Sequence, residues 1–401
     1  MGSGKTSAAI NMINESDDDT RFFFITPYLA QVDRIIRSCP GKQFEQPVVI
    51  DDYSKRRNLI QLVKDRKNIA STHAMFKCLT PEIMELFHQN EYTLIMDETF
   101  ITMEENTLCD LEDIKPLFNF GILTAPGKAG IVGHNLGDTN SKITNPYKNM
   151  CDNKMLGYCN TSGGDMYLLQ LFPIDNFLAF KEVYIMTYMF GGQIIASYFR
   201  LHGIKWMTLG VAGADVSDYH FSLSPTVSLP FNNISELIRI SYKRNDIGLE
   251  NSLSHTWYDK KCNKETIRRI CKNTYNFFHN DLRIKPRATI WTCFKSSLPL
   301  FEKDKTFKPY VNSFVPINAK ASNDYADRTA VAYPVNIFYK PYIKNFIQAG
   351  GIEFDEDMYA TSEMLQFIWR SAIRRGEPID LYIPSTRMRN LLQKWIDEIS
   401  C

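Results

Sequence analysis

Two short groups of residues in this sequence have the types and order that phosphate chemistry requires. The first is Gly-Ser-Gly-Lys-Thr at residues 2–6, which ends as a P-loop ends. In such a loop, backbone N–H groups surround the phosphates, the lysine reaches the β- and γ-phosphates, and the threonine hydroxyl coordinates Mg²⁺. Residues 7–14 follow as a helix whose N-terminal dipole also attracts phosphate. The predicted phosphate ligands are Gly2, Ser3, Gly4, Lys5, Thr6 and Ser7, with Thr6 on Mg²⁺.

The second group is the pair of acids Asp97 and Glu98, which closes an apolar run at residues 92–96. An acid at the end of a strand can hold Mg²⁺, and its neighbour can orient or deprotonate the attacking water. We therefore expect Asp97 to be a metal ligand and Glu98 a catalytic residue. The alternative is that Asp97 and Glu98 form an ordinary acidic loop after a strand.

A P-loop normally follows a strand and an earlier small residue, and both positions would precede Met1. We therefore expect domain 1 to lack its first strand in the chain as given. A chance Gly-Ser-Gly-Lys-Thr at a flexible terminus is the alternative interpretation.

The segments around these groups alternate between strands and helices. Strands are predicted at 21–27, 68–73, 92–99, 181–188 and near 205–209, and helices at 28–38, 55–67, 81–89 and 193–202. This alternation predicts a doubly wound parallel sheet, with ligands at the carboxyl ends of its strands. The glycine-rich stretch 101–180 is predicted as long loops or hairpins inserted in this domain, and 213–233 as a linker or exposed excursion.

A second α/β pattern fills the rest of the chain. Helices are predicted at 265–279, 329–338, 364–375 and 386–399, and strands at 286–294 and 380–384. The fold class is therefore α/β with two domains, 1–225 and 226–401.

The composition excludes several classes of protein. Apolar residues make up 44% and charged residues 23%, which is ordinary for a globular protein and excludes a disordered chain. The net charge of +1 neither requires nor excludes a nucleic-acid partner. The sequence has no run of 18 apolar residues, so no membrane span is expected. Nine cysteines without a Cys-x-x-Cys pair indicate reduced thiols and a cytoplasmic location, and the spacing of His134, Cys151 and Cys159 fits no usual zinc pattern.

The order of the motifs resembles that of superfamily 2 helicases and translocases, especially divergent bacteriophage or viral members. The resemblance rests on residues 2–6 (motif I), 26–31 (motif Ia), 71–76, 97–99 (motif II, in a DExx form), 187–190 (motif III), 290–295 (motif IV), 323–328 (motif V) and 366–375 (motif VI). Motif VI departs from the family pattern, because Trp369 stands where glycine is usual and its second arginine is Arg374 or Arg375, four or five residues after Arg370.

The resemblance implies two RecA-like domains that hydrolyse ATP in the cleft between them. The implied catalytic residues are Lys5, Asp97, Glu98, Gln366, Arg370 and Arg374, with Arg375 as the alternative to Arg374. An arginine from the second domain would stabilise charge on the γ-phosphate oxygens. Nucleic acid is the implied partner, DNA more than RNA, in replication or repair. The implied contacts with it are Thr26, Pro27, Ser71, Thr72, His73 and Asn323.

Two other functions fit the same residues. One is a P-loop ATPase of another class, such as a packaging motor or a switch that does not unwind nucleic acid. The other is a degenerate helicase core that binds nucleic acid without hydrolysing ATP.

Overall fold

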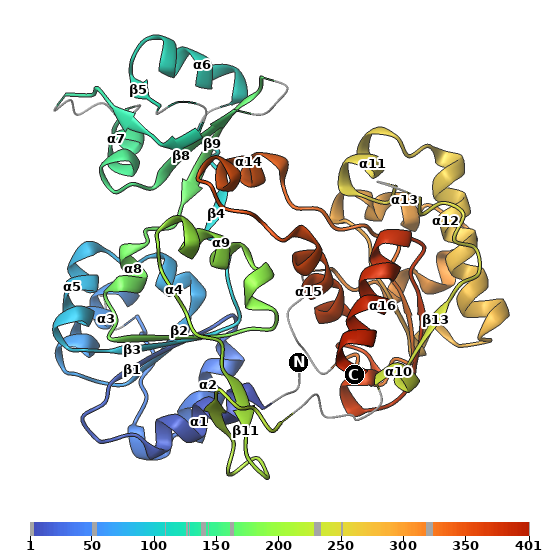
Figure 1. The fold of residues 1–401 in the computed structure, drawn as a ribbon, viewed down its shortest axis with the longest axis horizontal. Helices are drawn as coiled ribbons and strands as arrows, with labels where there is room; N and C mark the ends of the chain where they lie inside the picture. Colours follow the sequence, from blue (N-terminus) through green and yellow to red (C-terminus); the bar gives the residue numbers. More distant parts are fainter. Residues whose placement is uncertain are drawn as a thin grey trace. The chain divides into compact units, whose positions relative to one another are not determined.

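The computed structural model describes residues 4–400 except 50–53, 109, 126, 128, 138–141, 143, 161–163, 228–233, 250–251 and 318–323. It divides the chain into two compact units (Figure 1). The N-terminal unit comprises Gly4–Val227 and Tyr339–Phe354, and the C-terminal unit comprises Ser228–Phe338 and Asp355–Cys401. The break after Val227 lies two residues from the boundary expected after 225. The segment 339–354, which we expected in the second domain, packs with the first.

The N-terminal unit is built on a parallel four-stranded sheet. Its strand order is β10 (Glu182–Met186), β3 (Thr93–Asp97), β1 (Phe22–Thr26), β2 (Ile69–Thr72). All three pairings are parallel. These are four of the five strands predicted from the first α/β pattern. The strand predicted near 205–209 is wrong, because those residues form no strand and β11 starts at Gly210.

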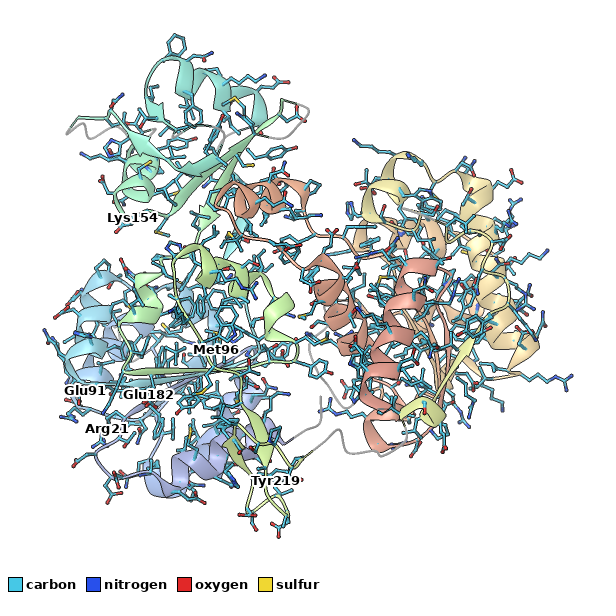
Figure 2. All side chains as sticks on the ribbon, in the orientation of Figure 1. Arg21, Glu91, Met96, Lys154, Glu182 and Tyr219 are labelled. Atoms are coloured by element: carbon cyan, nitrogen blue, oxygen red, sulfur yellow. The ribbon has the colours of Figure 1, made fainter. Side chains whose placement is uncertain are left out.

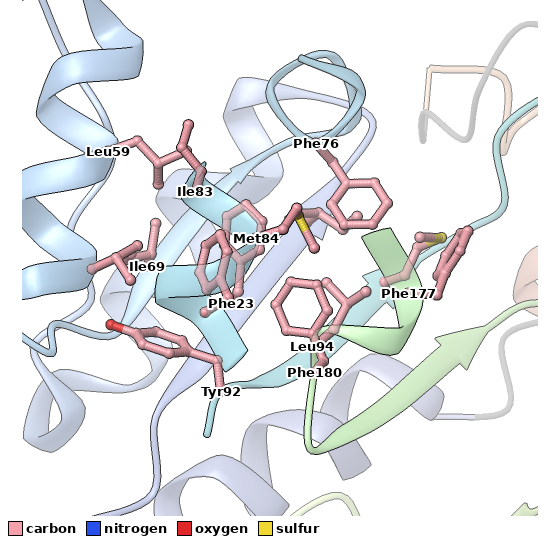
Figure 3. Packing of buried hydrophobic residues seen from close by; sticks show 14 of the residues in the cluster. Phe23, Leu59, Ile69, Phe76, Ile83, Met84, Tyr92, Leu94, Phe177 and Phe180 are labelled. Carbon is pink, nitrogen blue, oxygen red and sulfur yellow. The ribbon is translucent and has the colours of Figure 1, made fainter. Parts of the chain in front are cut away.

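Alternate side chains of this sheet enter two separate cores. In β1, Phe23 and Ile25 join one core, and Phe22 and Phe24 join the other. Helices α1 (Lys5–Glu15) and α2 (Leu29–Ser38) supply the second core. The first core, shown in Figure 3, takes residues from α3 (Lys55–Lys64), α4 (His73–Lys77), α5 (Pro81–Gln89), α8 (Asp175–Leu178) and α9 (Ile194–Leu201). The sheet is therefore covered by helices on both faces, as a doubly wound fold requires.

The segment between β3 and β10 is a small folded body inserted in the first unit, and it contains antiparallel hairpin pairing as predicted. Its antiparallel sheet has the order β4 (Met103–Glu105), β9 (Met166–Leu171), β8 (Leu156–Asn160), β6 (Ala129–Ile131). The pair β5 (Leu123–Thr124) and β7 (Gly133–His134) and helices α6 (Leu111–Asn119) and α7 (Asn145–Asp152) complete it. Although the segment is rich in glycine, it has a hydrophobic core of its own, formed by Ile114, Leu123, Val132, Tyr147, Cys151, Leu156, Tyr158 and Leu168.

Helix α14 (Pro341–Ala349) explains why residues 339–354 belong to the N-terminal unit. The Tyr342 hydroxyl donates a 3.0 Å hydrogen bond to Glu105, and its ring stacks on Tyr167 with centroids 4.6 Å apart. Gly157 lies under this helix, because a Cβ there would meet the Phe346 ring at 3.1 Å. These contacts join residues far apart in sequence, so periodicity alone could not assign α14.

The C-terminal unit has a second parallel sheet. Its order is β13 (Ile238–Ser241), β16 (Ile379–Tyr382), β15 (Ala330–Ala332), β14 (Thr289–Trp291). The helix predicted at 329–338 is wrong, because β15 occupies its start. A buried apolar run this short fits a central strand as well as a helix, and Pro334 follows it. The helices of this unit are α10 (Ile234–Leu237), α11 (His255–Lys260), α12 (Lys264–Asn276), α13 (Leu298–Glu302), α15 (Glu356–Ile368) and α16 (Thr386–Ser400).

The predicted fold class is confirmed: both units carry the doubly wound parallel sheet expected of two RecA-like domains. Within the ranges that the structure describes, no helix has the length and apolar character that a membrane span needs.

The close approach of Gly248 to the end of β16 gives a test of the C-terminal unit. A Cβ on residue 248 would lie 1.7 Å from the Pro384 carbonyl oxygen, so Gly248→Ala must displace backbone. We expect it to lower the free energy of unfolding by about 1–3 kcal/mol. Urea unfolding followed by tryptophan fluorescence measures this. Gly41→Ala is the control, since nothing lies within 4 Å of its added Cβ, and equal stability of the two variants would contradict the packing.

Candidate functional site

Several of the predicted site residues lie at the same end of the N-terminal sheet. Because its strands are parallel, their carboxyl ends lie together, at Thr26, Thr72, Asp97 and Met186. The chain continues from these ends into Pro27, His73 and Glu98. The sheet thus brings together predicted residues that the sequence separates by up to 72 positions.

The N-terminus of α1 carries backbone N–H groups that the helix itself does not use. Gly4 precedes the helix with a φ of 73°, in the left-handed region that favours glycine. The first intrahelical bond runs from Ala8 N to Gly4 O at 2.9 Å, so the N–H groups of Lys5, Thr6 and Ser7 have no acceptor inside the helix. Such an end fits a phosphate group. The predicted ligands Gly2 and Ser3 lie outside the described residues.

Lys5 lies beside the two acids at the end of β3. Burial lowers the pKa of Lys5 from its ordinary value, and the negative charges of Glu98 and Asp97 act against that shift. The ammonium group is therefore near both carboxylates and partly shielded from water. A lysine held there can exchange carboxylate oxygens for phosphate oxygens when a nucleotide binds.

The backbone turns sharply at Glu98. Its φ of 62° lies in the left-handed region, which costs a residue with a Cβ about 1–2 kcal/mol. A hydrogen bond of 3.1 Å from Glu98 N to Met186 O holds this turn against β10. Such backbone outliers concentrate at functional sites, where the surrounding structure fixes them.

His73 supports the acidic strand end from β2. Its ring is 7% exposed, and Nε2 lies 2.9 Å from the Asp97 carbonyl oxygen, so Nε2 carries the hydrogen that donates to it. Thr26 and Ser71 are also buried, whereas Pro27 and Thr72 are partly exposed and Asn323 lies outside the described residues. All six contacts with nucleic acid stay predictions, and burial favours Pro27 and Thr72 among those that the structure describes.

Tyr28, which the sequence analysis missed, is exposed to 43% directly after β1. An exposed aromatic ring at a strand end can stack on a nucleic-acid base. The signal was an aromatic residue directly after the Thr-Pro of the strand end.

A hairpin holds the first turns of α1. It is formed by β11 (Gly210–Ala212) and β12 (His220–Ser222), so the segment predicted as a linker or exposed excursion is, as far as Val227, a largely exposed hairpin. Tyr219, labelled in Figure 2, lies against Gly4, because a Cβ on Gly4 would be 2.4 Å from its ring. Asn11 Nδ2 donates to the carbonyl oxygens of Val216 and Tyr219 at 3.0 and 2.9 Å. No motif in the sequence marks this contact, since it joins residues more than 200 positions apart.

The predicted residues of motif VI lie in the C-terminal unit and differ in exposure. Arg370 is 4% exposed, and its Nη1 and Nη2 donate to the carbonyl oxygens of Pro316 and Ile317 at 3.1 and 3.0 Å. Arg375 pairs with Glu377, and Arg374 is exposed. The side chain of Gln366 donates to Ser362 at 3.4 Å. Arg370 thus holds the backbone at 316–317, whereas Arg374 presents its guanidinium to solvent.

The predicted Mg²⁺ ligands Thr6 and Asp97 stay a prediction. Hydroxyl and carboxylate oxygens such as those of Thr6 and Asp97 suit Mg²⁺, which needs few protein ligands beside substrate phosphates. Among the described residues, no group of three or more His, Cys, Asp or Glu side chains could hold a metal ion. His134 pairs with Asp152 at 2.9 Å.

The fold defines the class of protein, an α/β chain of two doubly wound parallel-sheet units. The family described as "YonV C-terminal Rossmann-like domain" matches residues 232–396. The "SPbeta prophage-derived uncharacterized protein YonV" of Bacillus subtilis (strain 168) is 33% identical over 413 residues, which cover 99% of this chain and 97% of the relative. The chain therefore belongs to the YonV family. The solved "Structure of S. tokodaii Xpd4" is similar over 97% of this chain and 91% of that chain, with 11% identity and a TM-score of 0.42.

The contact between Gly4 and Tyr219 can be tested by a double-mutant cycle. Gly4→Ala should destabilise α1, because alanine disfavours the left-handed φ and its Cβ would clash with the ring. Tyr219→Ala in the same chain removes the clash, so the two effects should fail to add by about 1 kcal/mol. Hydrogen exchange of the α1 amides measures each variant. Strict additivity would contradict the contact.

Proposed function

We propose that this protein is an ATP-driven helicase or translocase that acts on nucleic acid, DNA in preference to RNA. The observation that carries the proposal is the placement of Lys5, in the first turn of α1, beside Asp97 and Glu98 at the end of β3. A cationic and N–H-rich helix end facing two strand-end carboxylates fits the triphosphate of a nucleotide and its Mg²⁺.

Each residue has a separate task in the proposed hydrolysis. Lys5 and the α1 N–H groups bind the β- and γ-phosphates, and Glu98 orients the attacking water and accepts its proton. Thr6 and Asp97 hold Mg²⁺, which supplies positive charge to the phosphate oxygens when it is bound. Among the arginines of motif VI, we assign Arg374 to the γ-phosphate, since Arg370 is already bonded to two carbonyl oxygens.

Nucleic acid is the proposed track of the motor. The exposed Tyr28 and the partly exposed Pro27 and Thr72 stand at strand ends beside the nucleotide residues. Contacts from such positions reach the sugar-phosphate backbone and the faces of bases, and they read no sequence. The prophage origin of the relative fits a role in phage DNA replication or repair.

The first test is ATP hydrolysis with and without single-stranded DNA or RNA. Lys5→Ala should abolish turnover, because the β- and γ-phosphates lose their cation. Lys64→Ala removes an exposed lysine of the same unit and should leave the rate unchanged. Normal turnover in Lys5→Ala would contradict the placement of the nucleotide site at α1.

The same assay separates the alternatives. Turnover that nucleic acid stimulates, without strand separation on a forked duplex, would favour a motor or switch that does not unwind. Absence of turnover together with tight binding of nucleic acid would favour a binding module without ATPase activity.

Glu98→Gln separates binding of the nucleotide from its hydrolysis. The amide keeps the size of the side chain and cannot accept the proton of water, so turnover should fall by about 10²-fold or more. Affinity for MgATP, measured by calorimetry, should stay within a few-fold of the unsubstituted protein. A large loss of affinity would mean that Glu98 holds the site together and does not serve as the base.

A further inference from the structure

Helix α12 carries a line of cations on its outer face. Lys264, Arg268 and Lys272 follow one another at intervals of four residues, and all three are exposed. Residues spaced by four lie along one side of a helix, so the three side chains form a single stripe. We call these three residues the α12 stripe. The buried side of the helix carries Ile267, Ile270, Cys271 and Thr274, of which the first three join a hydrophobic core.

The neighbouring segments extend this positive charge. Residues 260–287 contain nine Lys and Arg but only two Asp and Glu, whereas the whole chain is nearly balanced with 46 and 45. Lys260 and Lys261 precede the stripe, and the exposed Arg283, Lys285 and Arg287 follow it. Figure 2 shows long side chains with nitrogen ends extending from this yellow helix.

The stripe has one acid beside it on the helix, Glu265, which stands three residues before Arg268. In the part of the chain that the structure describes, none of its three cations forms an ion pair, while their neighbour Arg269 pairs with Asp246. Glu265 is the one acid on α12 itself.

The stripe works against the stability of its own helix. Each of its two like-charge pairs at four-residue spacing costs about 0.2–0.5 kcal/mol. Lys264 stands in the first turn, where the positive end of the helix dipole disfavours a cation. Helix stability therefore does not explain these residue types, whereas an anionic partner that neutralises all three does.

We propose that the α12 stripe binds the sugar-phosphate backbone of a nucleic-acid strand. From Lys264 to Lys272 the stripe covers about 12 Å along the helix axis, which matches roughly three to four nucleotides at 3.4 Å each. Three aligned cations suit contacts with phosphates that carry no sequence information. The partner's identity rests on the proposed function, but the surface is distinct, because α12 belongs to the other unit from α1.

The test compares two triple variants of the full chain. One replaces Lys264, Arg268 and Lys272 by glutamine. The matched control replaces the exposed Lys115, Lys154 and Lys181 of the N-terminal unit by glutamine, which removes the same charge. Fluorescence anisotropy measures binding of a single-stranded oligonucleotide of about 20 nucleotides over a series of salt concentrations.

The stripe variant should bind the oligonucleotide more weakly, because its binding releases fewer counterions. The slope of log affinity against log salt should become shallower by about 2, which is roughly a 100-fold loss near 0.1 M salt. The control should stay close to the unsubstituted protein. Equal losses in both variants, or no loss in the stripe variant, would overturn the proposal. So would stripe-dependent binding to anionic phospholipid vesicles without stripe-dependent binding to DNA.

Two further measurements keep this result independent of the proposed ATPase. The stripe variant should unfold at the same or a higher temperature, because it removes like-charge repulsion, and a lower temperature would overturn the energetic argument. ATP turnover without nucleic acid should be unchanged in it. If the protein hydrolyses no ATP at all, the proposed function fails, while the anisotropy still decides the role of the stripe.

Discussion

The electrostatic pairing of Lys5 with Asp97 and Glu98 is the interaction on which the site depends. It is possible because α1 begins, at Lys5, where a parallel sheet presents the carboxyl ends of its strands. This arrangement is unfavourable in free energy in two ways: the Lys5 ammonium group is partly buried, and the backbone at Glu98 is left-handed. The two cores on either face of the sheet, fed by alternate residues of β1, supply the burial that offsets these costs.

The N-terminal unit also contains elements that do not belong to its parallel sheet. The antiparallel body between β3 and β10 has its own core, and α14 returns from the distant end of the sequence to pack against it. The β11–β12 hairpin clamps the first turns of α1 through Tyr219 and Asn11. The hairpin contact stabilises α1, and the α14 contact stabilises the antiparallel body.

Charge is distributed unevenly in a chain whose net charge is close to zero. In the N-terminal unit Lys5 lies beside two acids, whereas α12 of the C-terminal unit exposes Lys264, Arg268 and Lys272, which form no ion pair within the described residues. The first arrangement suits a small anion enclosed by protein. The second suits an extended polyanion that remains in water, because its charges stay solvated until phosphates replace the counterions.

The sequence by itself determined the strands β1, β2, β3, β10 and β16 and the place of Lys5, Asp97 and Glu98 at strand and helix ends. Continuous apolar runs and local turn chemistry carry that information. It could not determine β15, because a buried run of three residues has no diagnostic period, nor the core hidden among the glycines of 101–180. Tertiary structure alone decided that Tyr219 lies on Gly4, that α14 joins the N-terminal unit and that Arg370 is buried while Arg374 is exposed. These features depend on contacts between residues distant in sequence, whose energies no local pattern of residue types records.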